Sequence, residues 1–304
     1  MTLRAISGRP DCNTCSNTRH QSGDNTVKSA ENQIAESLGK CRSLRTTTND
    51  RPRRRVLLGL CGVAIVAVGA PTSSRELRPG IIGDDDRVRV EQRGPPWAAI
   101  GQVNVGGYRR VGQCTGTLIA PDVVLTAAHC VVDPWRAAPF PLHDIHFLAS
   151  VHGSENSGHS TAKCLHFPRG YKFPPQYTRP TMSDLATDMV EVVLNENLDV
   201  EPMPIAENGD WHARPSLVHA AYPADRRLVL SAHFGCQLLH ADRNPPLWLT
   251  DCDTHPASSG GPLLAKVDGM LQLVAITVAA GNGSPNVAVP ISPRNSSPPT
   301  RTCP

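Results

Sequence analysis

Short apolar runs separated by turn residues fill most of the chain between Pro95 and Pro293, and they constrain the fold more than any other feature. The clearest runs cover residues 98–105, 116–120, 123–126, 189–194, 228–230 and 271–278. Such runs, in a chain with 28 prolines and 24 glycines, are typical of an all-β protein built from short strands. The sequence therefore predicts a sandwich or a barrel, and about 200 residues are enough to bury a core without help from a cofactor or metal.

Charge is divided unevenly along the chain. Residues 1–55 hold 11 Lys and Arg against 5 Asp and Glu, whereas the remainder holds 19 against 22. The basic excess lies in polar N-terminal residues without helix or strand periodicity, so we expect residues 1–50 to be a disordered tail. Cys12, Cys15, His20 and Cys41 in this tail contain only one closely spaced ligand pair, too few for a structural zinc site. Because the main domain has no basic excess, nothing predicts nucleic-acid binding.

A basic cluster followed by an apolar run occupies residues 51–70. Four arginines between residues 51 and 55 precede residues 56–70, all apolar or small. This order is typical of a secretory signal, and the run is shorter than the ~20 residues that a membrane-spanning helix needs. Residues 51–70 are therefore either an export signal or a retained membrane anchor, and both place residues 71–304 outside the cytoplasm. We expect this domain to be secreted or periplasmic, anchored through 56–70 if that run is retained.

Six cysteines follow residue 71 and are disulfide candidates in an exported chain. They are Cys114, Cys130, Cys164, Cys236, Cys252 and Cys303. The pair Cys114 and Cys130 brackets a predicted strand–turn–strand unit, and the pair Cys236 and Cys252 brackets a similar loop, so we expect both bridges. The pairing of the other two cysteines stays open.

Three segments contain residues suited to nucleophilic catalysis. His129 ends an apolar run and lies beside a cysteine, where its ring can be held in one orientation. Asp188 directly precedes the apolar run 189–194, and Ser259 lies in a loop rich in Ser, Gly and Pro, where backbone N–H groups can converge on an oxyanion. Each segment alone is more often structural, but a serine, a histidine and a buried carboxylate together are the parts of a hydrolytic triad.

The three segments resemble those of the trypsin/chymotrypsin family of serine peptidases. Leu-Thr-Ala-Ala-His-Cys at residues 125–130 is similar to the family's histidine motif, and Ser-Gly-Gly-Pro at 259–262 to its serine motif. The order His, Asp, Ser is also that of the family. Residues 81–87 and 252–256 are most similar to the branch that contains bacterial glutamyl endopeptidases. The resemblance covers about residues 81–293 and implies two antiparallel six-stranded β-barrels with the active site in the cleft between them.

The resemblance implies a serine endopeptidase that hydrolyses proteins or peptides without a cofactor. Ser259 would attack the scissile carbonyl and form an acyl-enzyme, with His129 accepting and returning the proton. Asp188 would hold His129 in the useful tautomer, and it is preferred to Asp184 because the strand-like run begins directly after it. The backbone N–H groups of Ala257 and Ser259 would form the oxyanion hole.

Several residues of the serine loop depart from the family pattern. Ala257 replaces a glycine, and Ser258 replaces the acid that pairs with a freed N-terminal amine in trypsin-like zymogens. Thr254 matches a residue that grips the substrate carboxylate in glutamyl endopeptidases, but Thr277 stands where those enzymes have a histidine. Asp253 stands where trypsin has its specificity aspartate. It would therefore either select substrates with Arg or Lys or only cap its own loop.

The same residues are compatible with two functions other than that of an endopeptidase. Because Ala257 departs from the pattern of the oxyanion hole, the chain could instead be a catalytically impaired binding module on a peptidase scaffold. The same triad would also serve an esterase or another acyl transferase.

Overall fold

The computed structural model describes residues 78–106, 112–173, 179–207, 214–291 and 303. The expected tail over residues 1–50 and the expected signal or anchor over 51–70 lie outside these ranges. Within the described ranges, no helix is long and apolar enough to cross a membrane. The fold described below belongs to the compact unit Pro71–Pro304.

Six antiparallel strands close into a first barrel. They are β2 (Ile100–Val105), β3 (Gly112–Ala120), β4 (Val123–Thr126), β7 (Ile145–Ala149), β8 (Gly158–His166) and β9 (Val190–Leu194). Their order around the barrel is β2-β3-β4-β9-β8-β7, and β7 pairs again with β2. Leu118, Leu125, Phe147 and Val192 are each at most 2% exposed and belong to one apolar cluster. Closure of the barrel leaves none of these strands with a free edge.

A second set of six strands closes in the same way. They are β10 (Ser216–Ala221), β11 (Ser231–Arg243), β12 (Pro246–Thr250), β13 (Pro262–Val267), β14 (Met270–Ala279) and β15 (Asn286–Pro290). The order β11-β10-β13-β14-β15-β12 is closed by the pairing of β11 with β12, and the short strand β1 (Val88–Arg89) also pairs with β11. The expected fold of two antiparallel six-stranded β-barrels is confirmed.

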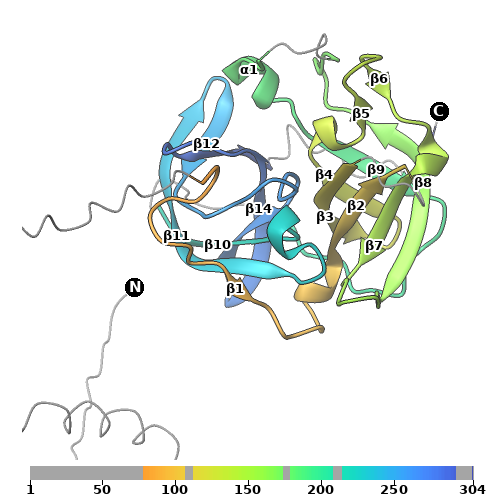
Figure 1. Ribbon diagram of the computed structural model, residues 1–304, viewed down its shortest axis with the longest axis horizontal. Helices are drawn as coiled ribbons and strands as arrows, with labels where there is room; N and C mark the ends of the chain where they lie inside the picture. Colours follow the sequence, from red (N-terminus) through yellow and green to blue (C-terminus); the bar gives the residue numbers. More distant parts are fainter. Residues whose placement is uncertain (1–77, 107–111, 174–178, 208–213, 292–302, 304) are drawn as a thin grey trace, which may run out of the picture. The chain divides into compact units, whose positions relative to one another are not determined.

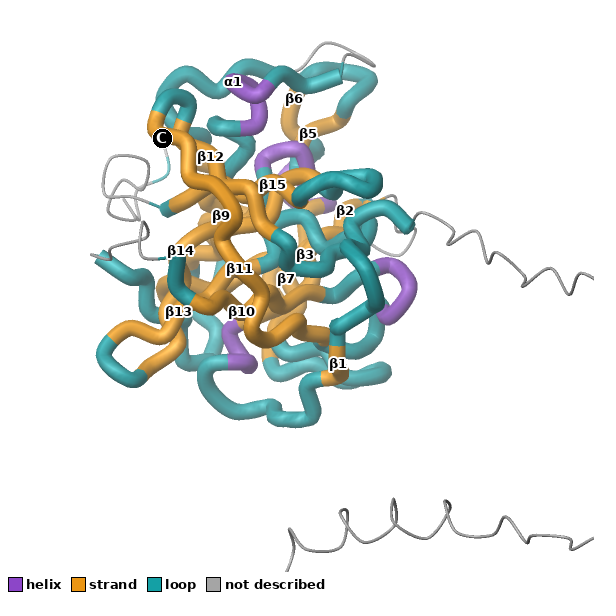
Figure 2. Tube along the Cα trace, turned by 90° about the vertical axis from the view of Figure 1, so that its left-hand side faces the viewer, coloured by secondary structure: helices purple, strands orange, loops and turns teal. Residues whose placement is uncertain are grey.

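The remaining elements, outside the barrel strands, are short (Figure 2). They are β5 (Val132–Asp133), β6 (Ala138–Pro139), α1 (Met182–Leu185) and the 3-10 turns Trp97–Ala99, Ala128–Cys130, Leu142–Asp144 and Ala224–Arg226. The turn Ala128–Cys130 and helix α1 matter most for function, because one carries His129 and the other ends three residues before Asp188.

The two barrels lie side by side and share an apolar core (Figure 1). Strand β13 illustrates how they join. Leu263 and Leu264 are both 0% exposed, yet Leu263 packs in a cluster within the second barrel, whereas Leu264 packs in the cluster that also contains the first barrel's interior. Because successive side chains of a strand point to opposite faces, one face of β13 lines its own barrel and the other faces the neighbouring barrel.

Three disulfides cross-link the described chain. Cys114–Cys130 and Cys236–Cys252 are present as expected, each closing a separation of 16 residues. The pairing that the sequence left open is Cys164–Cys303, which ties strand β8 to the C-terminal end of the chain across 139 residues. The bridge Cys114–Cys130 holds the turn with His129, and the bridge Cys236–Cys252 holds the start of the serine loop.

Replacing Cys236 and Cys252 together by serine should lower the free energy of unfolding by about 2–4 kcal/mol, because the unfolded chain regains the entropy that the bridge removes. Urea unfolding of the oxidised double variant and of the native protein measures this difference. Peptide mapping without reductant is the companion experiment. Equal unfolding midpoints, or free thiols at both native cysteine pairs, would contradict the assignment.

Candidate active site

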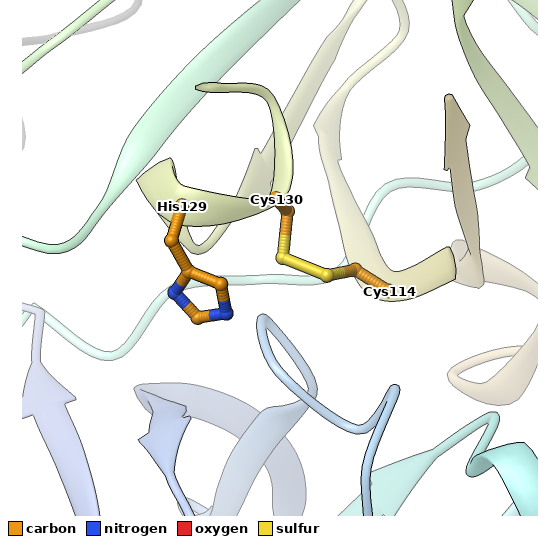
Figure 3. A group of neighbouring side chains, drawn as sticks. All are labelled: Cys114, His129 and Cys130. Carbon is orange, nitrogen blue, oxygen red and sulfur yellow. A yellow bond between two sulfur atoms is a disulfide. The ribbon is translucent and has the colours of Figure 1, made fainter. Parts of the chain in front are cut away.

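His129 lies on the 3-10 turn Ala128–Cys130, directly after strand β4. Its neighbour Cys130 is bonded to Cys114 of strand β3, so the turn is held against the first barrel (Figure 3). Ala127 and Ala128 are 0% exposed, whereas the His129 side chain is 42% exposed. The backbone of the turn is therefore fixed in the core while the imidazole remains accessible.

Asp188 binds His129 through both of its carboxylate oxygens. Oδ1 accepts the backbone N–H of His129 at 2.9 Å, and Oδ2 lies 2.6 Å from the ring atom Nδ1. The carboxylate is only 10% exposed. A carboxylate facing Nδ1 selects the tautomer with the proton on Nδ1, which leaves Nε2 able to accept a proton.

Asp188 also sets the proton affinity of the ring. Desolvation by the surrounding protein lowers the pKa of His129, but the charge of Asp188 and its hydrogen bond outweigh this effect and raise the pKa above its usual value. The pair therefore stabilises an imidazolium, the form that His129 takes after accepting a proton.

Asp184 has a different task, at the start of helix α1. Its backbone N–H donates to Oγ1 of Thr181, and its carboxylate accepts from the backbone N–H and the hydroxyl of Thr181 at 2.9 and 2.6 Å. This reciprocal capping box satisfies N-terminal groups of the helix and lowers the pKa of Asp184 through the side-chain hydrogen bond with Thr181. Asp188, and not Asp184, is the carboxylate that reaches His129.

The loop with Ser259 is hydrogen-bonded on both sides. The carbonyl of Ser259 accepts the backbone N–H of Thr115 on strand β3 at 2.9 Å. On the other side, the Gly260 N–H donates to the Thr277 carbonyl at 2.7 Å, and the Thr277 N–H donates to the Gly261 carbonyl at 2.9 Å. The loop is thus fastened to the first barrel through Thr115 and to the second barrel through Thr277.

Gly260 lies where the serine loop packs against the first barrel. Its φ of +79° is in the region that favours glycine, and a Cβ here would collide with the Thr115 carbonyl oxygen, Oγ1 of Thr126 and the backbone nitrogen of Ala127. Ala127 is two residues before His129, and Gly260 directly follows Ser259. The close approach brings the segment with Ser259 against the segment with His129.

The backbone of residues 256–259 leaves two N–H groups free. The Pro256 carbonyl accepts from the Ala224 N–H at 2.7 Å, so the N–H of Ala257 across the same trans peptide points the opposite way. The Ser258 N–H donates to the carbonyl of His255 at 2.9 Å, whereas the N–H groups of Ala257 and Ser259 find no acceptor in the described ranges. Two free backbone N–H groups, one at the serine itself and one two residues before it, are the kind of donors that an oxyanion hole requires.

Thr115 holds this backbone in place, a role that sequence reasoning missed. Its hydroxyl donates to the Ala257 carbonyl at 3.2 Å and accepts from the Tyr222 N–H at 2.9 Å. Thr115 is 0% exposed. The signal was its place next to Cys114 in the strand leading to the histidine, but pattern alone does not reveal which loop a buried hydroxyl reaches.

Ala257 adopts a φ of +74°, although it has a Cβ. A left-handed conformation costs a non-glycine residue about 1–2 kcal/mol. Ser258, where a zymogen would have its acid, is 1% exposed, and its Oγ accepts from the backbone N–H of His255 at 3.3 Å. The Ser258 hydroxyl is uncharged and hydrogen-bonded within its own turn, so it cannot form an ion pair with a freed N-terminal amine.

The geometry of Asp253 argues against substrate binding. Asp253 is 0% exposed, with Oδ1 accepting the Ile82 N–H and Oδ2 the Asp86 N–H, both at 2.8 Å. Its own backbone N–H donates to Nδ1 of His233 at 2.9 Å. Because each oxygen of this buried carboxylate already accepts a backbone N–H, neither is open to a substrate cation. This geometry favours the interpretation in which Asp253 caps its own loop over the one in which it selects Arg or Lys.

The N-terminal segment before β1 is therefore part of the site's support. The carbonyl of Gly80 accepts from the Thr254 N–H and from the Asn286 side chain, both at 2.9 Å, and the Ile81 N–H donates to the Arg78 carbonyl within a turn. Farther along, Arg87 pairs with Asp85 at 2.8 Å and Asp225 at 2.7 Å; the hydrogen bond from Arg87 lowers the pKa of Asp85 to about 2. Ile81 is only 7% exposed, so it lies inside this packed segment.

Thr254 and Thr277, the other two expected specificity residues, are both buried but differ in their hydrogen bonds. Thr254 is 2% exposed, and its Oγ1 is buried without a hydrogen-bond partner among the described residues. Thr277 is 5% exposed and binds the serine loop through its backbone. A buried hydroxyl without a partner is the more notable of the two, because burial of an unbonded polar group costs stability.

A cavity of about 310 Å³ adjoins His129 and Asp188. Tyr171, Leu185 and Val278 supply an apolar part of its wall. Apolar walls beside a few polar groups are typical of a ligand pocket. The cavity places space for a bound chain next to the exposed imidazole.

Two groups of possible metal ligands occur in the described ranges, and both involve disulfides. They are Cys114, His129 and Cys130, drawn in Figure 3, and Cys236, Asp251 and Cys252. A cysteine in a disulfide has no thiolate for a metal. Neither group therefore has the donor set of a metal site.

The chain belongs to the trypsin-like peptidase family, whose domain model matches residues 114–276. The match begins at the first cysteine of the disulfide beside His129 and ends in strand β14, one residue before Thr277. It therefore includes both the histidine turn and the serine loop.

Individual relatives are distant. The CLIP domain-containing serine protease B15 of Anopheles gambiae is 24% identical over 221 residues, which cover 62% of this chain. This chain spans 59% of the length of that protein. Among solved structures, a Glu endopeptidase in complex with MPD has a TM-score of 0.56 at 22% identity, covering 70% of this chain and 94% of its own. The VesB protease of Vibrio cholerae has a TM-score of 0.52 at 17% identity, covering 67% and 63% respectively. These structures support the two-barrel fold.

Replacing Asp188 by asparagine should lower turnover about 10⁴-fold, because the ring would lose its useful tautomer, whereas Asp184→Asn should change turnover little. Because Asp188 raises the pKa of His129, its loss should also move the acidic limb of the kcat/KM profile to lower pH. Peptide hydrolysis by both purified variants between pH 4 and 9 measures these effects. A large loss only in the Asp184 variant would transfer the role to that residue.

Proposed function

We propose that this protein is a serine endopeptidase that uses His129, Asp188 and Ser259 as its triad and the N–H groups of Ala257 and Ser259 as its oxyanion hole. The observation that carries this proposal is the pairing of Asp188 with both the backbone and the ring of His129, at 2.9 and 2.6 Å. Membership of the trypsin-like peptidase family supports the same chemistry.

In the first half of the reaction, Oγ of Ser259 attacks the carbonyl carbon of the scissile bond as Nε2 of His129 accepts its proton. The carbonyl oxygen becomes an oxyanion, to which Ala257 and Ser259 donate. When the tetrahedral intermediate collapses, the C–N bond breaks and His129 gives its proton to the leaving amine. Asp188 stabilises the imidazolium between these two proton transfers.

In the second half, water attacks the acyl ester of Ser259. Nε2 of His129 accepts a proton from this water, and the same two N–H groups stabilise the second oxyanion. Collapse of the intermediate breaks the ester C–O bond, returns the proton to Oγ of Ser259 and releases a carboxylic acid. The exposed side of His129 is accessible to the water that this step needs.

The substrates we propose are proteins or peptides that the domain meets outside the cytoplasm. Three disulfides fit an oxidising compartment, such as the periplasm or the extracellular space. Residues 51–70 would direct the domain there as an export signal or anchor. Residues beside the cleaved bond would contact the apolar wall of the cavity next to His129. Asp253 would support the serine loop rather than select Arg or Lys.

Ser259→Ala and His129→Ala should each lower peptidase activity by several orders of magnitude while leaving the domain folded. A fluorophosphonate probe should label the native protein at Ser259 and fail to label the serine variant. Circular dichroism and the unfolding midpoint provide the check on folding. A native protein that binds peptides without reacting with the probe would instead be a binding module, and a folded variant with near-native activity would refute the triad.

Ala257→Gly should raise turnover on a small ester by less than about 10²-fold, with little change in KM, because Ser259 still supplies the second donor. Glycine adopts the φ of +74° without strain, so it should hold the N–H toward the oxyanion more of the time. The same change should raise the free energy of unfolding by about 1 kcal/mol. Ester kinetics and urea unfolding test both effects. Unchanged or lower turnover would mean that the alanine already maintains a complete hole.

A further inference from the structure

The 3-10 turn Ala224–Arg226 lies against the serine loop and sets the direction of one of its N–H groups. The Ala224 N–H donates to the Pro256 carbonyl at 2.7 Å. Because the peptide between Pro256 and Ala257 is a planar trans unit, this hydrogen bond also orients the Ala257 N–H. One donor of the proposed oxyanion hole therefore depends on where the turn Ala224–Arg226 is held.

The backbone of Ala257 is strained in this orientation. Its φ of +74° is unfavourable for a residue with a Cβ. Rotation of the peptide between Pro256 and Ala257 would bring φ back to negative values and would turn the N–H away from the oxyanion. The hydroxyl of Thr115 donates to the Ala257 carbonyl at 3.2 Å, but that carbonyl belongs to the next peptide. The contact that opposes the rotation is therefore the hydrogen bond from Ala224.

The side chain of Asp225 fixes the turn Ala224–Arg226. Its two carboxylate oxygens accept from the two terminal nitrogens of Arg87 at 3.1 and 2.7 Å. The Arg87 side chain is only 3% exposed, and it also pairs with Asp85 at 2.8 Å. Arg226 donates a further hydrogen bond to the Arg87 carbonyl at 2.6 Å. The turn is thus bound to the segment before β1 through a buried guanidinium.

His255 connects the same carboxylate to the serine loop. Its ring atom Nδ1 lies 3.4 Å from Oδ1 of Asp225, and it is buried without a hydrogen bond to any residue that the structure describes. The His255 N–H donates to Oγ of Ser258 at 3.3 Å, and the Ser258 N–H donates to the His255 carbonyl at 2.9 Å. The His255 backbone is therefore fixed within the turn that contains Ala257.

The contact between His255 and Asp225 is attractive when Nδ1 carries a proton, because a carboxylate stabilises a donor that faces it. Burial raises the pKa of Asp225, but its hydrogen bond with Arg87 and the nearby cationic groups, His255 among them, lower it overall. Asp225 thus stays ionised near neutral pH, and its charge attracts both His255 and Arg87.

We propose that Asp225 and His255 are positioning residues for the oxyanion hole. Their contact keeps the turn Ala224–Arg226 against the serine loop, so that the Ala257 N–H stays directed at the oxyanion. The inference rests on the proposed peptidase function and adds two side chains to it. Both act through the hydrogen bond between Ala224 and Pro256 and not on the reacting atoms.

The test replaces His255 by two side chains of similar size and different polarity. His255→Leu should lower kcat for p-nitrophenyl acetate about 10-fold, less than the loss of a whole donor, because the Ala257 N–H is displaced only part of the time. KM should stay unchanged, since the lost interaction is made only in the transition state. His255→Asn should keep kcat close to the native value, because its amide N–H can donate to Asp225 in place of Nδ1–H. Equal kcat values for the two variants would contradict the positioning role.

A double-mutant cycle tests whether His255 acts through Asp225. Asp225→Asn should also lower kcat at unchanged KM, because it removes the charge that attracts the ring. In that background, His255→Leu should cause little further loss. Losses that multiply across the two sites would mean that the side chains act independently, which would refute the proposed contact. Should the leucine variant not fold, Asp225→Asn alone decides, and an unchanged kcat would refute the role.

A second histidine–aspartate pair in the same barrel provides the matched control. Nε2 of His240 lies 2.9 Å from Oδ1 of Asp242 on strand β11, and both side chains are exposed. His240→Leu should leave kcat unchanged, and the unfolding midpoint of each variant measures whether it is folded. A loss of kcat in this control equal to that of His255→Leu would make the effect non-specific and count against the role.

Labelling by a fluorophosphonate separates this inference from the function on which it rests. The native protein and each variant should be labelled completely at Ser259, the His255→Leu variant more slowly. A native protein without labelling or ester hydrolysis would overturn the peptidase proposal, and the positioning role with it. An active, labelled native protein whose folded His255→Leu variant has the native kcat would overturn the positioning role alone.

Discussion

The contact between the serine loop and the first barrel determines the rest of the site. The nucleophile and the base of the proposed triad come from different barrels, so their distance is set only by how closely those barrels pack. Gly260 permits an approach that no residue with a Cβ allows, and it does so against Thr115, Thr126 and Ala127. Thr115 then fixes the loop twice, through its N–H to Ser259 and its hydroxyl to Ala257.

The same loop is supported by the buried carboxylate of Asp253, whose Oδ2 also lies 3.6 Å from Nδ1 of His233. Asp253 accepts from Ile82 and Asp86, so two peptide dipoles balance a charge that has no access to water. Arg87 is likewise buried, with Asp85 and Asp225 around it. Because Ser258 has no charge to offer an amine, the serine loop is supported instead by backbone groups of residues 80–86.

The sequence was sufficient for the fold, and insufficient for the contacts that support the candidate site. Strand-length apolar runs predicted a sandwich or a barrel, the resemblance carried by the LTAAHC and SGGP motifs implied two barrels, and the structure contains them. The contact of Asp188 with His129 agrees with its position before strand β9, and the capping role of Asp184 follows from the short helix that the pattern did not indicate. The roles of Asp253 and Thr115 depend on partners far away in the chain, and local pattern has no access to such contacts.

The anchoring of Asp253 also has a consequence for how the chain matures during its synthesis. Ile82 and Asp253 are 171 residues apart, so the segment that supports the serine loop leaves the ribosome long before the carboxylate that it must meet. The first barrel can close as soon as β9 has emerged, because all its strands precede Asn195. The serine loop cannot reach its final shape until nearly the whole chain is available, which couples the last step of folding to residues made first. A nascent or truncated chain would therefore have a formed histidine turn without a formed serine loop, and so would lack the complete site that the proposed peptidase activity needs.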